Sequence, residues 1–244
     1  MTFNCLVPKW PAPTNINACV TTRNGGISKG QFASLNLGDH VGDTAKNVFL
    51  NRSIVNKNLQ LKQDPIWLNQ THSTICIDLD TTDDNTADAV ITKTPYKVLA
   101  IMTADCLPIL LCDLKGKEIA AIHAGWRGLC NGIIENTLAN MSTPKEQLIA
   151  YLGPSICGKC YEVRQDVYDL FSQKYAINGF TPYHDKWLLN KPLIATHILK
   201  SHNVNAIYLS NRCTFEEKEQ FFSYRRDKET GRMASLIWIK EKIL

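Results

Sequence analysis

The chain has 244 residues, of which 44% are hydrophobic and 20% charged, with a formal net charge of +4. This composition is that of an ordinary globular protein, which excludes a disordered, collagen-like or coiled-coil chain. The charge is small and the basic residues are scattered, so we expect no nucleic-acid partner. No apolar run approaches the ~18 residues that a membrane-spanning helix needs, so we expect no membrane association.

Nine cysteines are the unusual feature of the composition. The count is odd, and the N-terminus lacks a basic region followed by a long apolar segment. Neither a disulfide framework nor a signal peptide is therefore predicted, and reduced thiols in the cytoplasm are the better interpretation. The only C-x-x-C is formed by Cys157 and Cys160, and it is typical of half a zinc knuckle or a redox dithiol. Because no second pair exists, packing is the favoured interpretation.

The predicted elements begin in a loop-rich N-terminal third. It holds a short strand at 17–22, a turn at 24–26, a helix at 48–61 and a short strand at 66–70. Apolar and β-branched runs then predict strands in the middle third, at 87–92, 97–102, 107–112 and 118–123. A helix with an apolar stripe is expected to follow over 129–141.

The remaining elements alternate less regularly. Residues 143–146 match a capping box with proline at the first helical position, which predicts a short turn of helix. The later expected elements are a strand at 147–152, helices at 163–171 and 192–198, and strands at 206–209 and 235–239. This order predicts an α/β (α+β) fold of mixed sheets flanked by helices. No repeat or linker interrupts it, so residues 1–244 are predicted to form a single domain.

Three segments place a potential metal ligand at the end of an apolar strand, beside a turn. The ligands are His72, Cys106 and His123, and they are much farther apart than the ligands of a structural zinc site. The fold would have to assemble such a site, and three protein ligands would leave a fourth position open for catalysis. Judged from the residues alone, structural roles for these histidines compete with metal binding. No phosphate-binding loop, H-E-x-x-H or G-x-S-x-G motif is present.

A series of motifs in a specific order then identifies a resemblance. The motifs are Ser34–Gly38, Trp67–His72, Ala87–Val90, Met102–Pro108, His123–Gly128, Leu152–Pro154, Cys160–Val163 and Phe221–Asp227. Across nearly its whole length the chain resembles the YfiH-like family, also called laccase-domain or polyphenol-oxidase proteins and purine nucleoside phosphorylases. The resemblance implies packed mixed sheets, similar to the catalytic domain of cytotoxic necrotizing factor toxins. It places zinc ligands at His72, Cys106 and His123. Cys157 departs from the family, which more often has glycine there.

The resemblance also implies an activity: zinc-dependent phosphorolysis of purine nucleosides and deamination of adenosine. Adenosine, inosine and methylthioadenosine are the expected substrates, with phosphate as the second small-molecule partner. Arg127 is the first candidate for the anion, because it follows His123 where a helix begins and guanidinium suits a planar oxyanion. Arg225 and Arg226 are further candidates. Asp105 is expected to orient a ligand or act as general base, and Asn36 to close over the substrate.

Several alternatives remain open at this point. The same zinc centre could serve an amidase that edits peptidoglycan precursors of the UDP-MurNAc-amino acid type. A copper polyphenol oxidase is disfavoured, because six scattered histidines without a His-x-His pair are too few for a multicopper centre. Cys106 could also act as a metal-free nucleophile with His123 as its base, or the cleft could bind a ligand without turnover. The sequence predicts no oligomeric state.

Overall fold

The computed structural model describes residues 3–176 and 179–241. A five-stranded mixed sheet is built from strands far apart in the chain, in the order β1-β2-β14-β6-β3. Its middle strand β14 pairs antiparallel with β2 and β6, and β3 pairs parallel with β6. The strands are β1 (Cys5–Leu6), β2 (Ile16–Thr21), β3 (Pro65–Trp67), β6 (Val98–Thr103) and β14 (Met233–Ile239).

A six-stranded mixed sheet has the order β13-β9-β7-β8-β5-β4. Its central strands β7 and β8 are antiparallel neighbours and are buried along their whole length. The strands are β4 (Cys76–Asp78), β5 (Ala89–Thr92), β7 (Leu107–Asp113), β8 (Ile119–Ala124), β9 (Leu148–Leu152) and β13 (Ala206–Leu209). Continuous apolar runs of this kind are expected where both faces of a sheet are covered.

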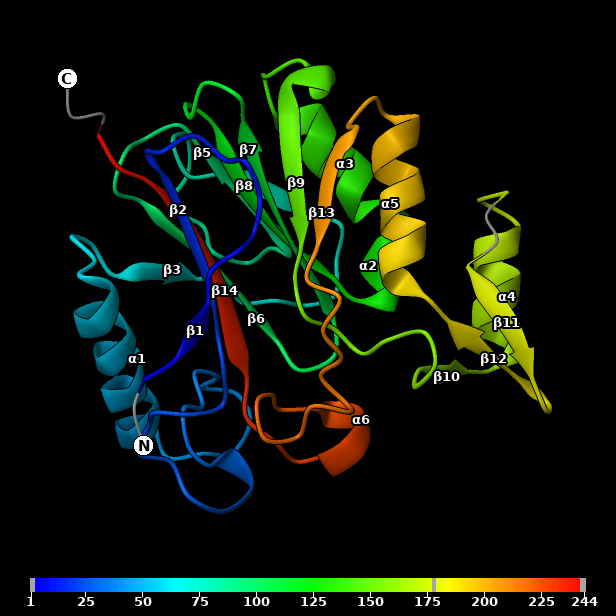
Figure 1. Ribbon diagram of the computed structural model, residues 1–244, viewed down its shortest axis with the longest axis horizontal. Helices are drawn as coiled ribbons and strands as arrows, with labels where there is room; N and C mark the ends of the chain where they lie inside the picture. Colours follow the sequence, from blue (N-terminus) through cyan, green and yellow to red (C-terminus); the bar gives the residue numbers. More distant parts are fainter. Residues whose placement is uncertain (1–2, 177–178, 242–244) are drawn as a thin grey trace.

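Alternate residues of strand β7 show how the layers are arranged. Leu110 and Cys112 face a core shared with Leu99 and Ile237 of the five-stranded sheet, so the two sheets pack face to face. Ile109 and the other alternate residues face a second core under the helices. The helices over this second core are α2 (Trp126–Asn131), α3 (Ile133–Asn140) and α5 (Lys191–Ser201). Helix α1 (Ala45–Leu59) covers the opposite outer face, which gives four layers (Figure 1).

A small three-stranded antiparallel sheet completes the fold, in the order β10-β12-β11. Its strands are β10 (Glu162–Val163), β11 (Phe180–Tyr183) and β12 (Lys186–Leu189), and helix α4 (Gln165–Ser172) packs on it through stacked aromatic rings of Tyr168 and Trp187. This unit projects beyond α5 at the side of the molecule away from α1 (Figure 1). Short elements fill the loops: η1 (Gly30–Phe32), η2 (Lys145–Gln147) and α6 (Tyr224–Asp227).

The predicted mixed α+β fold class is confirmed, and two local predictions are corrected. The helix expected over 129–141 is two helices, because Gly132 has φ +102° and ends α2 in a left-handed turn. The capping box at 143–146 does not form: the backbone N–H of Thr143 donates to Glu118 and Pro144 precedes a 3₁₀ turn without a side-chain cap. Among the described residues, no helix is long and apolar enough to cross a membrane.

Candidate active site

Three side chains meet where the two large sheets approach each other. His72 follows β3, Cys106 precedes β7 and His123 lies in β8, and one ligand atom of each lies within 4.8 Å of the others. The Sγ of Cys106 is 3.9 Å from the Nε2 of His72, and the two imidazole centroids are 4.8 Å apart. Exposure rises from buried His123 through Cys106 to exposed His72, so the cluster is accessible from solvent.

A buried carboxylate, Asp88, orients this cluster. The Nδ1–H of His123 donates to Asp88 at 2.7 Å, which turns the other ring nitrogen toward Cys106. The backbone N–H groups of Thr71, His72 and Ser73 also donate to the same carboxylate, at 3.1, 3.0 and 2.6 Å. Asp88 therefore fixes two of the three ligating segments, as outer carboxylates do in metalloprotein sites.

The electrostatics of the cluster favour a thiolate. Burial opposes ionisation of Cys106, but His123 and His72 outweigh burial and lower the pKa of Cys106 to about 5. Burial likewise opposes protonation of His123, while Cys106 and Asp88 raise its pKa to about 9. Asp88 has a pKa lowered to about 2, because hydrogen bonds from His123 and Ser73 outweigh its burial. A thiolate beside two imidazoles is a donor set that fits zinc.

The backbone leaves space for this arrangement. A Cβ at Gly125 would lie 2.8 Å from the Cδ2 of His72 and 3.2 Å from the Sγ of Cys106. Any other residue at this position would therefore displace two of the three donors. His72 itself adopts φ +60°, a left-handed conformation that non-glycine residues rarely occupy. Such conformations persist where the surrounding contacts hold them, and they gather at functional sites.

Asp105 lies next to Cys106 and also has a left-handed backbone, with φ +90°. Its carboxylate accepts hydrogen bonds from the hydroxyls of Thr214 and Ser223 at 2.6 and 3.0 Å, and from the backbone N–H of Arg225 at 2.6 Å. Asp105 is only 6% exposed. The structure therefore places Asp105 as an anchor of the loop before β7.

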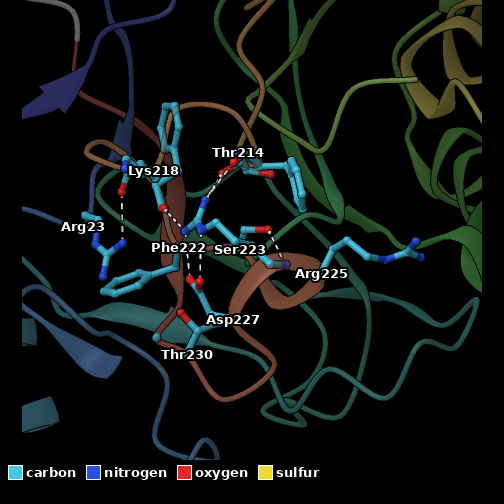
Figure 2. Close-up of polar contacts among 12 residues, drawn as sticks. Arg23, Thr214, Lys218, Phe222, Ser223, Arg225, Asp227 and Thr230 are labelled. Carbon is cyan, nitrogen blue, oxygen red and sulfur yellow. Dashed lines mark hydrogen bonds and ion pairs between the residues drawn. The ribbon is translucent and has the colours of Figure 1, made fainter. Parts of the chain in front are cut away.

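Two cations share one aromatic ring beside the cluster. The Nζ of Lys191 lies 3.8 Å from the centroid of Tyr161, and the guanidinium carbon of Arg225 lies 4.8 Å from it. Arg225 donates to the carbonyl of Glu162 and points away from Ser223 and Asp227 (Figure 2). Lys191 is 1% exposed, and no ion pair joins it to a carboxylate within the part of the chain that the structure describes.

The charge of Lys191 is retained despite this burial. Desolvation lowers its pKa to about 8, and Cys106 and Asp105 limit the fall. The ammonium is therefore largely protonated at pH 7. Burying a positive charge is costly; Cys106 and Asp105 offset part of that cost, and a bound anion would relieve more of it.

The other predicted site residues lie in different surroundings. Arg127 is exposed and stacks on Trp126, with its guanidinium carbon 4.4 Å from the ring. Arg226 donates to the carbonyls of Thr214, Phe215 and Phe221 and pairs with Asp227, so its guanidinium is saturated by the protein. Figure 2 shows the polar contacts around the segment 214–230 that contains Arg226, including the bond that Arg23 donates to the carbonyl of Lys218.

Asn36 is fully buried, and its amide contacts only the protein. It donates to the carbonyl of Gly38 and the carboxylate of Asp43, and accepts from the N–H groups of Gly38 and Arg232. The structure thus brings His72, Cys106 and His123 together, with Asp105 and Arg225 nearby. It places Asn36 and Arg226 in the loop framework instead.

Sequence reasoning missed three residues of the site: Asp88, Tyr161 and Lys191. Asp88 and Tyr161 lie inside motifs of the resemblance, and an acidic residue between two buried strand positions was the available signal for Asp88. Lys191 carried no such signal, because a lysine in the first turn of a helix is ordinarily exposed.

The comparisons with known proteins agree with this fold. A family model described as multi-copper polyphenol oxidoreductase laccase matches residues 17–240. The chain belongs to this family. A Haemophilus influenzae protein named purine nucleoside phosphorylase is 46% identical, covering 98% of this chain and 100% of its own. Purine nucleoside phosphorylase YfiH of Escherichia coli is 42% identical over 96% of this chain and 98% of its own.

Two solved structures are also similar. A Neisseria meningitidis protein of the DUF152 family has a TM-score of 0.91 and 46% identity, covering 98% of this chain and all of its own. YlmD from Geobacillus stearothermophilus has a TM-score of 0.86 and 29% identity, covering 95% and 94%. The resemblance predicted from the motifs is therefore confirmed at the level of family and fold.

Proposed function

We propose that the protein is a zinc-dependent purine nucleoside phosphorylase that also deaminates adenosine, acting as a single cytoplasmic domain. The observation that carries this proposal is the meeting of His72, Cys106 and His123 within 4.8 Å, beside the buried cation Lys191. The names of the relatives at 42–46% identity support the phosphorolysis. Inosine and methylthioadenosine are the other expected nucleosides.

Zinc is the metal that we propose for the three donors. Two imidazoles and a thiolate fit its preference, and three protein ligands are typical of catalytic zinc. The family name refers to copper, but a multicopper centre needs more imidazoles. Of the described histidines, only His72 and His123 join this cluster. When bound, zinc supplies Lewis-acid polarisation and lowers the pKa of a coordinated water.

The cations of the chain would hold the phosphate. Lys191 and Arg225 both lie against the ring of Tyr161. Burial raises the pKa of the Tyr161 hydroxyl, and the charge of Arg127 partly opposes that rise, so Arg127 also lies near this ring. A phosphate held there would form the new bond to the ribose C1′ as the bond between the ribose and the base breaks, which would release the free base and ribose 1-phosphate. Charge-assisted hydrogen bonds to such an anion are among the strong ones in proteins.

Asp105 contributes by positioning. Its carboxylate oxygens are occupied by Thr214, Ser223 and the N–H of Arg225. We therefore assign Asp105 to holding Cys106 and Arg225 in place, and not to proton transfer. The hydrogen bond from Nδ1 to Asp88 holds the His123 ring in one orientation.

The test is direct turnover by the zinc-loaded protein. We expect adenosine and inosine to give free base and ribose 1-phosphate only when phosphate is present, and adenosine to give inosine without it. A Cys106→Ala variant should lose both reactions. If the wild type turned over a UDP-MurNAc-amino acid and left every nucleoside intact, the proposal would be wrong.

A further inference from the structure

A second cluster of metal-ligating side chains lies outside the candidate active site. Cys157, Cys160, Cys213 and Glu216 each place a donor atom within 4.8 Å of the others. The sequence carries these residues as two pairs with the same spacing, C-x-x-C and C-x-x-E. A four-ligand site needs a second pair of donors beside the C-x-x-C pair. The fold supplies that pair as Cys213 and Glu216, with glutamate in place of a fourth cysteine.

The backbone brings the two pairs together in a defined way. Ser155 and Cys213 form an isolated parallel bridge, and the N–H of Thr214 donates to the carbonyl of Ser155 at 3.2 Å. The N–H of Cys160 donates to the carbonyl of Cys157 at 3.1 Å, which closes a tight turn around the first pair. The N–H of Cys157 donates to the Sγ of Cys213 at 3.3 Å. This hydrogen bond holds the Cys213 side chain against the first pair.

The cluster gathers three thiols and one carboxylate. The neighbouring carboxylate of Glu217 is occupied by Arg212 and by the N–H of Cys213. No basic side chain forms an ion pair with Glu216 among residues 3–176 and 179–241.

We propose that Cys157, Cys160, Cys213 and Glu216 bind a second zinc ion, with a structural role. Three thiolates and one carboxylate complete the four-coordinate set of a closed zinc site. Thiolate ligands select zinc over hard cations such as magnesium or calcium. Cys157, Cys213 and Glu216 also line a surface cavity of about 860 Å³, which gives the ion a path from solvent.

The ion would join two loops that both contact Asp105. The loop after β9 donates the N–H of Ile156 to the carbonyl of Asp105 at 3.2 Å, and the loop after β13 donates the Thr214 hydroxyl to its carboxylate at 2.6 Å. Asp105 precedes Cys106 of the candidate active site. The second zinc would therefore stabilise the loops that hold Asp105 beside Cys106. This inference does not depend on the proposed reaction.

Metal content per chain tests this site. The wild type, purified after expression with added zinc, should hold about two zinc ions, and Cys160→Ser and Cys106→Ala should each hold about one. Glu216→Gln should retain the second ion more weakly under dialysis against a chelator. Two matched controls, Glu219→Gln in the same loop and Cys76→Ser outside both clusters, should keep both ions.

Cobalt(II) substitution supplies a readout that does not depend on activity. The cobalt-loaded wild type should show an intense thiolate-to-metal charge-transfer band, which keeps most of its intensity in Cys106→Ala and falls to the weaker band of the single-thiolate centre at Cys106 in Cys160→Ser. A single ion that is lost in Cys106→Ala together with the whole charge-transfer band would overturn the proposal. A disulfide among Cys157, Cys160 and Cys213 in the purified protein would overturn it too. A single ion kept in Cys106→Ala but lost in Cys160→Ser would support this site and contradict the candidate active site.

Discussion

The carboxylate of Asp88 holds His123 by its ring and His72 by its backbone, so one buried residue orients two donors that lie 51 positions apart in the chain. The bond to the His123 ring is 2.7 Å and the bond to the His72 N–H is 3.0 Å. The candidate centre is therefore rigid on the side of β5 and β8. If the three donors hold a metal, Asp88 would support it without being one of the ligands.

Asp88→Asn should consequently weaken zinc binding while leaving all three ligands in place. The amide loses the charge that stabilises the His123 ring, and an outer-shell change of this kind costs about 10–100-fold in metal affinity. Competition with a chromogenic chelator measures the change. Asp83→Asn, at an exposed position of the loop after β4, is the matched control and should bind zinc as the wild type does. Equal affinities for all three proteins would contradict the role of Asp88.

Removal of the metal should abolish turnover and expose a reactive thiol. Chelation should leave the protein inactive, and added zinc should restore it. The pKa of Cys106 is about 5 in the chain without metal, so the chelated protein should be alkylated rapidly at this residue at pH 7. Bound zinc should protect the thiol. Full activity after chelation, together with loss on alkylation, would instead identify Cys106 as a metal-free nucleophile.

Lys191→Leu should raise the KM for phosphate about 10–100-fold, because a charge-assisted hydrogen bond contributes about 1.5–3 kcal/mol. Leucine preserves most of the buried volume, so the variant should fold. Nucleoside KM should change little, and kcat at saturating phosphate should stay within a few-fold of the wild type. Lys200→Leu, in the last turn of the same helix, is the control. If the phosphate KM were unchanged, Lys191 would have no part in binding the anion.

Asp80 should make the free energy of unfolding fall as the solution becomes acidic. Burial opposes its ionisation, but the N–H of Lys93 and the hydroxyls of Thr92 and Thr94, each donating at 2.7 Å, hold the pKa of Asp80 far below its ordinary value. A carboxyl with a depressed folded pKa stabilises the fold above its unfolded pKa of about 3.9 and loses that contribution as the pH falls.

The measurement is the free energy of unfolding of wild type and Asp80→Asn across pH. Because Asp80 is exposed and solvent screens its contacts, the difference should be about 1 kcal/mol and constant between pH 6 and 8, and it should shrink below about pH 4. Asp84→Asn, in the exposed loop that follows, should show no such difference. A gap that widened toward acid pH would reverse the sign argued for Asp80.

Much of the fold could be predicted from local patterns. The strands β6 to β9, β13 and β14 were expected within two residues of their observed bounds, because buried strands carry continuous apolar runs. The start of α1 was expected at 48 and lies at Ala45, where the Thr44 side chain caps the helix by accepting from the N–H of Asn47 at 3.3 Å. The strands β10, β11 and β12 were missed, because their residues are largely half-buried or exposed and lack a clear alternation.

The candidate site was predictable only in part, since its donors meet through long-range pairing. Each ligand could be assigned to a strand end, but the register that places His123 opposite Pro108 is a property of the sheet. Cys213 and Glu216 show the same limit. Their spacing was visible, but only the bridge between Ser155 and Cys213 brings them to the C-x-x-C pair.

The position of β14 has a consequence for biosynthesis. This strand is the last of those described along the chain, yet it lies between β2 and β6 at the middle of the five-stranded sheet. During translation both neighbours emerge first and present unpaired edges, which are templates for association with other chains. The ribosome must therefore deliver residues 233–239 before that sheet can close. Nascent chains that stall earlier should be the species that chaperones engage.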